Sequence, residues 1–157
     1  MLLMKTIYTD SAVRGNPSDK GAWSFFVVKE NGSLATSVCE VRAGGIIPGK
    51  VTNNIAEYYA IIEAAKYAKS AEILDVKFRS DSSLAVNQLL GKFKVKNSGI
   101  IPYYEEALKQ FASLEYVEVE WVPRENPWLS RVDAYCNKIL DTIPAPLRKV
   151  ELLGKDF

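Results

Sequence analysis

Four acidic residues stand where predicted strands end or predicted helices begin: Asp10, Glu57, Asp81 and Asp133. If the fold gathers them, their carboxylates repel one another, and a bound divalent cation is the usual way to relieve that repulsion. Ligands that are all oxygen atoms favour Mg²⁺ or Mn²⁺. Two such ions can stabilise the attacking and the leaving oxygen of a phosphoryl displacement. The four acids therefore point to metal-dependent phosphoryl-transfer chemistry.

Histidine is absent from the sequence. This excludes Ser–His and Cys–His nucleophilic pairs, histidine general bases and zinc sites with histidine ligands. The two cysteines, Cys39 and Cys136, have no C-x-x-C spacing, so we expect two free, buried thiols, although a disulfide between them stays open.

The bulk composition is that of one ordinary globular domain. The chain has 157 residues, of which 48% are hydrophobic and 25% charged. No apolar run approaches the roughly 18 residues that span a bilayer, and the apolar opening of residues 1–4 is too short for a signal peptide. We therefore expect a cytoplasmic monomer without a membrane segment. The net charge of +1 leaves any binding of nucleic acid to local basic patches.

Hydrophobic periodicity and turn residues predict an α/β fold with a mixed sheet of five strands, flanked by helices. The predicted strands span residues 5–9, 22–28, 34–41, 76–80 and 117–121. The predicted helices span residues 55–69, 84–90, 102–113 and 129–143. Asn54 is the predicted N-cap of the first helix, and Ser82 can cap the second. Residues 144–157 are left as a C-terminal tail to a domain of residues 1–143.

The predicted elements give the four acids a common location. If the first and fourth strands are parallel neighbours, Asp10 and Asp81 lie side by side at the carboxyl end of the sheet. Two helix N-termini could bring Glu57 and Asp133 to the same place. Each acid alone has an ordinary explanation as a helix cap, a turn residue or a complement to a helix dipole, so the prediction depends on the combination.

Four blocks of sequence, in this order along the chain, resemble type 1 ribonuclease H over about residues 4–142. The blocks are Asp10 with residues 14–17 (Arg-Gly-Asn-Pro), residues 52–57 (Thr-Asn-Asn-Ile-Ala-Glu), residues 80–82 (Ser-Asp-Ser), and residues 121–124 (Trp-Val-Pro-Arg) with Asp133. The resemblance implies a ribonuclease H-like fold and hydrolysis of the RNA strand of RNA–DNA hybrids, leaving 3′-hydroxyl and 5′-phosphate ends. It also implies that the four acids bind two Mg²⁺ ions, with Mn²⁺ as a substitute.

The same resemblance suggests the residues that contact the hybrid. RNA is distinguished from DNA by its 2′-hydroxyl in a wide minor groove, and Asn53, with Ser11 and Ser83 nearby, would contact that strand. The DNA strand or its phosphates would meet Asn16, Thr52 and Asn54, and also Arg14 unless Arg14 is an ordinary surface charge. Lys94 and Lys96 lie in a basic stretch that suits phosphate contact or a merely solvated face.

Three departures from the family pattern carry expectations of their own. Ser11 stands where glycine is typical, so the approach of the RNA strand is less certain. The histidine of a mobile loop is missing, and Arg124, Glu125, Asn126 or Arg131 could substitute for it. We expect slower turnover, or a role for Glu125, rather than inactivity. The basic protrusion of some members is also missing, so hybrid affinity should be weaker than in those members and depend steeply on salt.

Three other readings stay open at this point. Another nuclease of the same fold, such as a Holliday-junction resolvase, would carry similar acids. A nucleic-acid-binding module with a degenerate site would lack catalysis. A structural metal-binding domain would gain stability from the metal alone.

Overall fold

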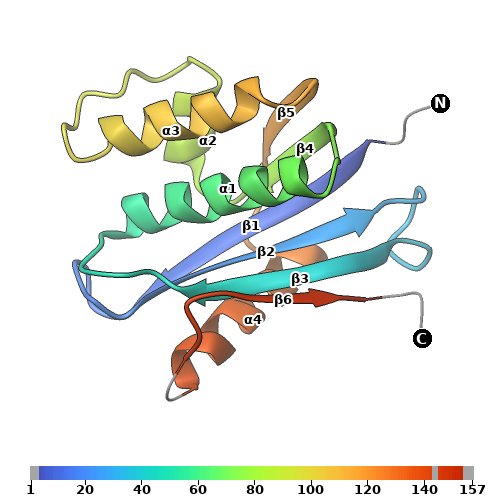
Figure 1. Ribbon diagram of the computed structural model, residues 1–157, viewed down its shortest axis with the longest axis horizontal. Helices are drawn as coiled ribbons and strands as arrows, with labels where there is room; N and C mark the ends of the chain where they lie inside the picture. Colours follow the sequence, from blue (N-terminus) through green and yellow to red (C-terminus); the bar gives the residue numbers. More distant parts are fainter. Residues whose placement is uncertain (1–3, 143–144, 154–157) are drawn as a thin grey trace.

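The computed structural model describes residues 4–142 and 145–153, and these form a mixed sheet with helices on both faces (Figure 1). The strand order is β5-β4-β1-β2-β3-β6. Parallel pairing joins β1 to β4 and β4 to β5, and the other neighbours are antiparallel. The strands are β1 (Lys5–Val13), β2 (Gly21–Lys29), β3 (Val38–Ile46), β4 (Asp75–Ser80), β5 (Tyr116–Trp121) and β6 (Lys149–Leu152).

The expected sheet of five strands is wrong by one strand. All five predicted strands are present, and β6 adds a sixth along β3. The four residues of β6 follow two prolines and lack a buried alternating pattern, and Leu152 is 77% exposed. Because its partner β3 lies about a hundred residues earlier in the chain, only tertiary contact could identify this strand.

The helices form two unequal layers. The helices are α1 (Asn53–Ser70), α2 (Ser83–Leu89), α3 (Ile101–Ala112) and α4 (Pro127–Asp141). In Figure 1, α1, α2 and α3 lie on one side of the sheet and α4 lies on the other. Residue 143, the predicted end of the last helix, lies outside the described residues.

Alternation along β2 sends its side chains into two different hydrophobic clusters. Trp23, Phe25 and Val27 belong to the core that includes the small alanines of α1. Phe26 and Val28 belong to the core beneath Leu129 and Val132 of α4. Because successive side chains of a strand face opposite sides, one almost wholly apolar strand anchors both helical layers.

Two element boundaries near the predicted site differ from expectation. The first strand continues past Asp10 to Val13, because it pairs with β2 beyond the point where pairing with β4 ends at Tyr8. The first helix is capped by Thr52 rather than Asn54, since the extended Thr52 accepts the Ile55 N–H on its hydroxyl oxygen at 3.2 Å. The third strand is also later than predicted, because residues 31–37 form the preceding turn.

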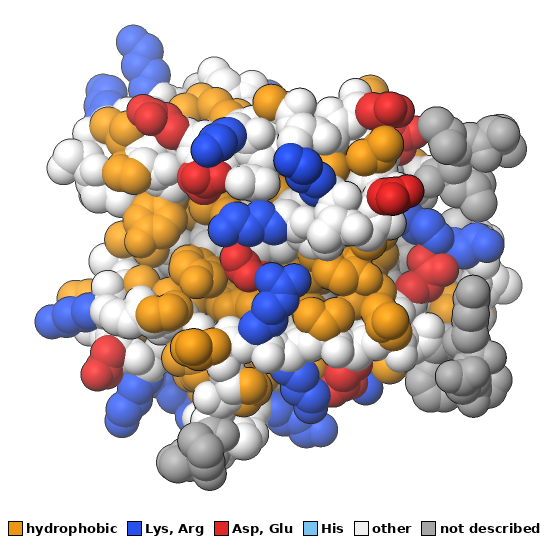
Figure 2. All heavy atoms as spheres, in the orientation of Figure 1, with side chains coloured by type: hydrophobic (Ala, Val, Ile, Leu, Met, Phe, Trp, Pro, Cys, Tyr) orange, Lys and Arg blue, Asp and Glu red, His pale blue; other side chains and the backbone are white. Residues whose placement is uncertain are grey.

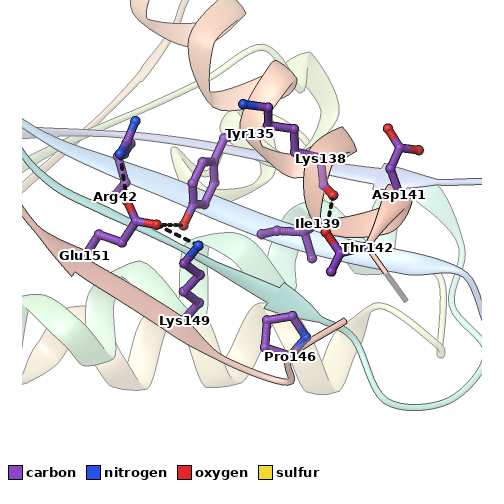
Figure 3. A pocket seen from close by; sticks show the side chains of 9 residues that line it. All are labelled: Arg42, Tyr135, Lys138, Ile139, Asp141, Thr142, Pro146, Lys149 and Glu151. Atoms are coloured by element: carbon purple, nitrogen blue, oxygen red, sulfur yellow. Dashed lines mark hydrogen bonds and ion pairs between the residues drawn. The ribbon is translucent and has the colours of Figure 1, made fainter. Parts of the chain in front are cut away.

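The segment after α4 is tied to both layers of the molecule. Figure 3 shows Glu151 of β6 paired with Arg42 of β3 at 2.7 Å and with Lys149 at 2.8 Å, beside Tyr135 of α4. From the same segment, Arg148 reaches Glu63 of α1 at 3.2 Å. The hollow lined by these α4 and β6 residues contains none of the four predicted acids.

Both cysteines are free, which excludes the disulfide, and Cys136 is buried while Cys39 is half-buried. Among residues 4–142 and 145–153, no helix combines the length and the apolar character that a bilayer crossing requires.

Candidate active site

Three of the four predicted acids meet at the carboxyl end of the parallel strands. One carboxylate oxygen from each of Asp10, Glu57 and Asp81 lies within 4.8 Å of the other two. Asp10 comes from β1, Glu57 from α1, and Asp81 directly follows β4. Segments far apart in the sequence therefore converge on one acidic cluster.

The parallel pairing of β1 with β4 sets the position of two of these acids. Lys5 pairs with Val76 and Tyr8 with Arg79, so both strands point their carboxyl ends the same way. Asp10 lies two residues beyond the paired stretch of β1, inside the strand rather than at its predicted end. Asp81 follows β4, where the Trp121 indole N–H donates to its backbone oxygen at 3.1 Å.

Glu57 reaches the cluster from the second turn of α1 rather than from the predicted first turn, because the helix begins at Asn53. Its Oε1 accepts the Ser11 hydroxyl at 2.7 Å. Its Oε2 is buried and has no hydrogen-bond partner in the described chain. A buried carboxylate oxygen without a donor is costly unless a cation compensates it.

Burial and mutual repulsion raise the pKa values of these acids above their ordinary range. Burial raises the pKa of Asp10, and the charges of Glu57 and Asp81 raise it further. Burial also raises the pKa of Glu57, against the hydrogen bond from Ser11, which lowers it. For Asp81, burial raises the pKa while the positive charge of Arg124 opposes the rise.

Asp133 lies at the margin of the cluster and is not one of its three closest members. It is half-buried on α4, where its backbone oxygen accepts the Asn137 amide at 3.1 Å. Its negative charge raises the pKa values of Asp10, Glu57 and Asp81, which places it within electrostatic reach of all three.

The cluster suits a hard divalent cation. Its donors are carboxylate oxygens from three separate elements, which is the ligand chemistry of Mg²⁺ and Mn²⁺. The unpartnered Glu57 Oε2 and the raised pKa values both indicate charge that the protein itself leaves uncompensated.

The N-terminus of α1 gathers several of the predicted hybrid contacts. Asn16 Oδ1 accepts the Asn53 N–H at 3.0 Å, which ties the turn after β1 to the start of the helix. The Asn53 and Asn54 side chains are exposed beside the Thr52 cap. Together these residues form a polar rim on the α1 side of the acids.

Two other predicted contacts are engaged within the protein. The Arg14 guanidinium pairs with Asp141 at 2.6 Å and donates to the Asn137 backbone oxygen at 3.3 Å, both on α4. Ser83, the exposed first residue of α2, accepts the Asn87 amide on its hydroxyl oxygen at 3.2 Å.

The basic stretch lies in the loop between α2 and α3. Lys94 and Lys96 are exposed, line a shallow hollow with Phe93 and Tyr104, and form no ion pair within the described residues. Figure 2 shows basic side chains projecting at the corner that this loop occupies in Figure 1. Elsewhere on that face, basic and acidic side chains are interspersed, in keeping with the net charge of +1.

Two of the candidates for the role of the missing histidine, Arg124 and Glu125, directly follow β5. Arg124 lowers the pKa of Asp81 by its charge, and Glu125 raises it. Both residues therefore lie within electrostatic reach of the cluster, on the side of Asp81.

Sequence reasoning does not mark Trp121 as a site residue, and it assigns Ser11 to the RNA strand rather than to Glu57. Trp121 belongs to a recognised motif block, which was the only available signal. The hydrogen bonds of both residues depend on which strands are neighbours, and local pattern does not reveal that.

Comparison with known proteins places these features in a family. The reverse transcriptase-like family matches residues 9–130. The bifunctional protein Rv2228c of Mycobacterium tuberculosis is 30% identical over 118 residues, which are 75% of this chain and 31% of that protein. Ribonuclease HI of Halobacterium salinarum is 31% identical over 134 residues, 85% of this chain and 63% of that protein. The chain thus spans less than two thirds of the length of these relatives.

Solved structures agree with the sequence matches. The crystal structure of the Halobacterium salinarum enzyme superposes with a TM-score of 0.78 at 30% identity, covering 88% of this chain and 98% of that one. LC11-RNase H1, solved in complex with an RNA/DNA hybrid, superposes with a TM-score of 0.74 at 27% identity, covering 90% and 99%.

Proposed function

This chain belongs to the reverse transcriptase-like family as a type 1 ribonuclease H, and from that premise we propose that it hydrolyses the RNA strand of RNA–DNA hybrids. The observation that carries the proposal is the convergence of Asp10, Glu57 and Asp81 oxygens within 4.8 Å at the carboxyl end of β1 and β4. The structural relative bound to a hybrid supports the choice of substrate. A cytoplasmic location and a monomeric state stay predictions.

The acids would hold the metal. Asp10, Glu57 and Asp81 would be the close ligands, and Asp133 would complete the set from the margin of the cluster. When bound, two Mg²⁺ ions, or Mn²⁺ in their place, supply an activated water and stabilise the leaving oxygen, which gives 3′-hydroxyl and 5′-phosphate ends.

The polar rim would orient the hybrid. Asn53 would contact the RNA 2′-hydroxyls in the minor groove, with Ser83 beside it. The DNA strand would follow Asn16, Thr52 and Asn54 toward Arg14, whose guanidinium would exchange its contacts on α4 for a phosphate. Lys94 and Lys96 would meet the backbone further along.

Arg124 and Glu125 would substitute for the loop histidine that this chain lacks. The Arg124 charge near Asp81 would stabilise negative charge that develops on the phosphate, and Glu125 would carry a proton toward the leaving oxygen. Neither side chain is held in the interior, so both can adjust as substrate binds.

The test is cleavage of an end-labelled RNA–DNA hybrid with Mg²⁺, beside duplex DNA, duplex RNA and single-stranded RNA. We expect cuts only in the RNA strand of the hybrid, and their loss in Asp10→Asn. Asp75→Asn is the matched control, because Asp75 begins β4 at the end opposite to Asp81, and it should keep full cleavage.

Two outcomes would contradict the proposal. Cutting of branched duplex DNA in preference to the hybrid would indicate a resolvase of the same fold. Binding of the hybrid without cleavage in Mg²⁺ and in Mn²⁺ would indicate a binding module.

A further inference from the structure

We propose that Ser11 is a positioning residue that holds Asp10 and Glu57 in place for metal binding, rather than a contact to the RNA strand. The proposal rests on the proposed function only in taking these two acids as metal ligands. It concerns a position where the family pattern has glycine, which has no hydroxyl to offer.

The geometry gives Ser11 two donors and directs both at the cluster. Its backbone N–H donates to Asp10 Oδ1 at 2.8 Å. Its hydroxyl donates to Glu57 Oε1 at 2.7 Å. One residue therefore links a carboxylate of β1 to a carboxylate of α1.

The position of Ser11 in the sheet explains why both donors are available. Ser11 is fixed in β1 by its register with Trp23 of β2. The parallel pairing with β4 stops at Tyr8, so β4 makes no backbone hydrogen bonds to Ser11. Both donors of Ser11 are thus free of β4, and they bond to Asp10 and to Glu57 of α1.

As a result, the two carboxylate oxygens of Glu57 are in different situations. Oε1 is occupied by the Ser11 hydroxyl, whereas Oε2 is buried and unpartnered within the described residues. A carboxylate held in this way offers one oxygen to a cation and loses little side-chain freedom on binding it. Partners of this kind, which orient a ligand without touching the metal, typically affect metal affinity by about 10–100-fold.

The Ser11 hydroxyl could instead contact the RNA strand, and the experiment must distinguish that role from positioning of the acids. If Ser11 contacts the RNA strand, its removal raises the KM for the hybrid and leaves metal affinity unchanged. If Ser11 positions the acids, its removal weakens metal binding in the absence of nucleic acid.

The experiment is calorimetric titration of the full chain with Mn²⁺ alone. We expect Ser11→Ala and Ser11→Gly to bind Mn²⁺ about tenfold more weakly. Ser11→Thr keeps the hydroxyl on a residue that suits a strand, and it should restore most of the affinity. Ser70→Ala is the matched control, because Ser70 ends α1 far from Glu57 and its hydroxyl donates only to the Tyr67 backbone oxygen.

Thermal melting of each variant without metal shows whether the fold is kept. If Ser11→Gly does not fold, the Mn²⁺ affinities of Ser11→Ala and Ser11→Thr are compared instead. Unchanged Mn²⁺ affinity in folded Ser11→Ala overturns the proposal, as does failure of the parent chain to bind Mn²⁺. Tenfold weaker Mn²⁺ binding in a protein whose parent cuts no hybrid supports the role of Ser11 while the proposed function fails.

Discussion

The Trp121 indole N–H donates a 3.1 Å hydrogen bond to the backbone oxygen of Asp81, across the ends of two parallel strands. The indole is about half exposed, and Trp121 is not among the buried core residues. This contact fixes the backbone of the residue that brings a carboxylate from β4 into the cluster.

Trp121→Phe should therefore reduce kcat more than it changes the KM for the hybrid, with a loss of stability of about 1 kcal/mol. Steady-state kinetics and urea unfolding check this. Tyr116→Phe is the control, because Tyr116 is similarly exposed at the opposite end of β5 and donates only to Glu118. Equal kinetic effects in both variants would refute the positioning role of the indole.

Asp10→Asn should stabilise the metal-free protein, on the order of 2 kcal/mol at neutral to alkaline pH. Burial and the charges of Glu57 and Asp81 raise the pKa of Asp10, so the folded state disfavours its ionised form. The amide removes that charge at nearly constant volume. Differential scanning calorimetry with a chelator measures the effect, and a lower Tm for the variant would contradict it.

The stability of the metal-free protein should fall as pH rises. Because the pKa values of Asp10 and Glu57 are higher in the folded than in the unfolded chain, the folded chain holds protons that unfolding releases. This contribution is complete below the unfolded pKa of about 4 and disappears as pH rises through the folded values. Melting between about pH 5 and pH 9 should show a falling Tm with a chelator. Mn²⁺ should restore the Tm at the alkaline end of this range. An unchanged Tm across the range would contradict the claim that burial and mutual repulsion raise the pKa values of these acids.

Replacing Lys94 and Lys96 together by Gln should weaken hybrid binding and reduce the slope of log affinity against log salt by about one for each lost phosphate contact. Cleavage at saturating hybrid should be unaffected, since the hollow that Lys94 and Lys96 line contains none of the four acids. Binding measured by fluorescence anisotropy at several salt concentrations tests this. Lys109→Gln, at the far end of α3, should leave the slope unchanged.

Gly45→Ala should destabilise the protein by about 1–3 kcal/mol, because a Cβ at this position would collide with the Leu147 backbone. The same region carries the 2.9 Å hydrogen bond from the Ile46 N–H to the Pro146 oxygen. Urea unfolding measures the loss. Leu152→Ala, an exposed change in the neighbouring strand β6, should cost little, and equal costs would argue against a specific fit at Gly45.

The hydrophobic pattern of the sequence correctly predicted the elements whose conformation depends mainly on neighbouring residues. The apolar run of β2 and the alternation of β5 identify strands, and the helical stripe of α4 at Val132, Cys136 and Ile139 identifies its buried face. The motif blocks identified the acids, and the assumed parallel neighbours β1 and β4 brought Asp10 and Asp81 together.

The remaining errors arise where distant segments decide the outcome. Asp10 lies inside β1 because β2 extends the strand, and β6 exists because β3 offers it a partner. Thr52 rather than Asn54 caps α1, since backbone conformation selects between two adjacent residues of similar capping ability. The link from Ser11 to Glu57 spans forty-six positions, and no periodicity encodes it.

The β6 strand also bears on how this protein behaves at high concentration. With β6 in place, the central residues 41–44 of the nine-residue β3 are paired on both sides, so a shorter part of β3 is open to a strand from another molecule. The strand left at the border has only four residues and carries Lys149 and Glu151, and short, charged border strands resist edge-to-edge aggregation. The C-terminal segment thus shortens the stretch of β3 that is open to intermolecular β-pairing, at the side away from the acids.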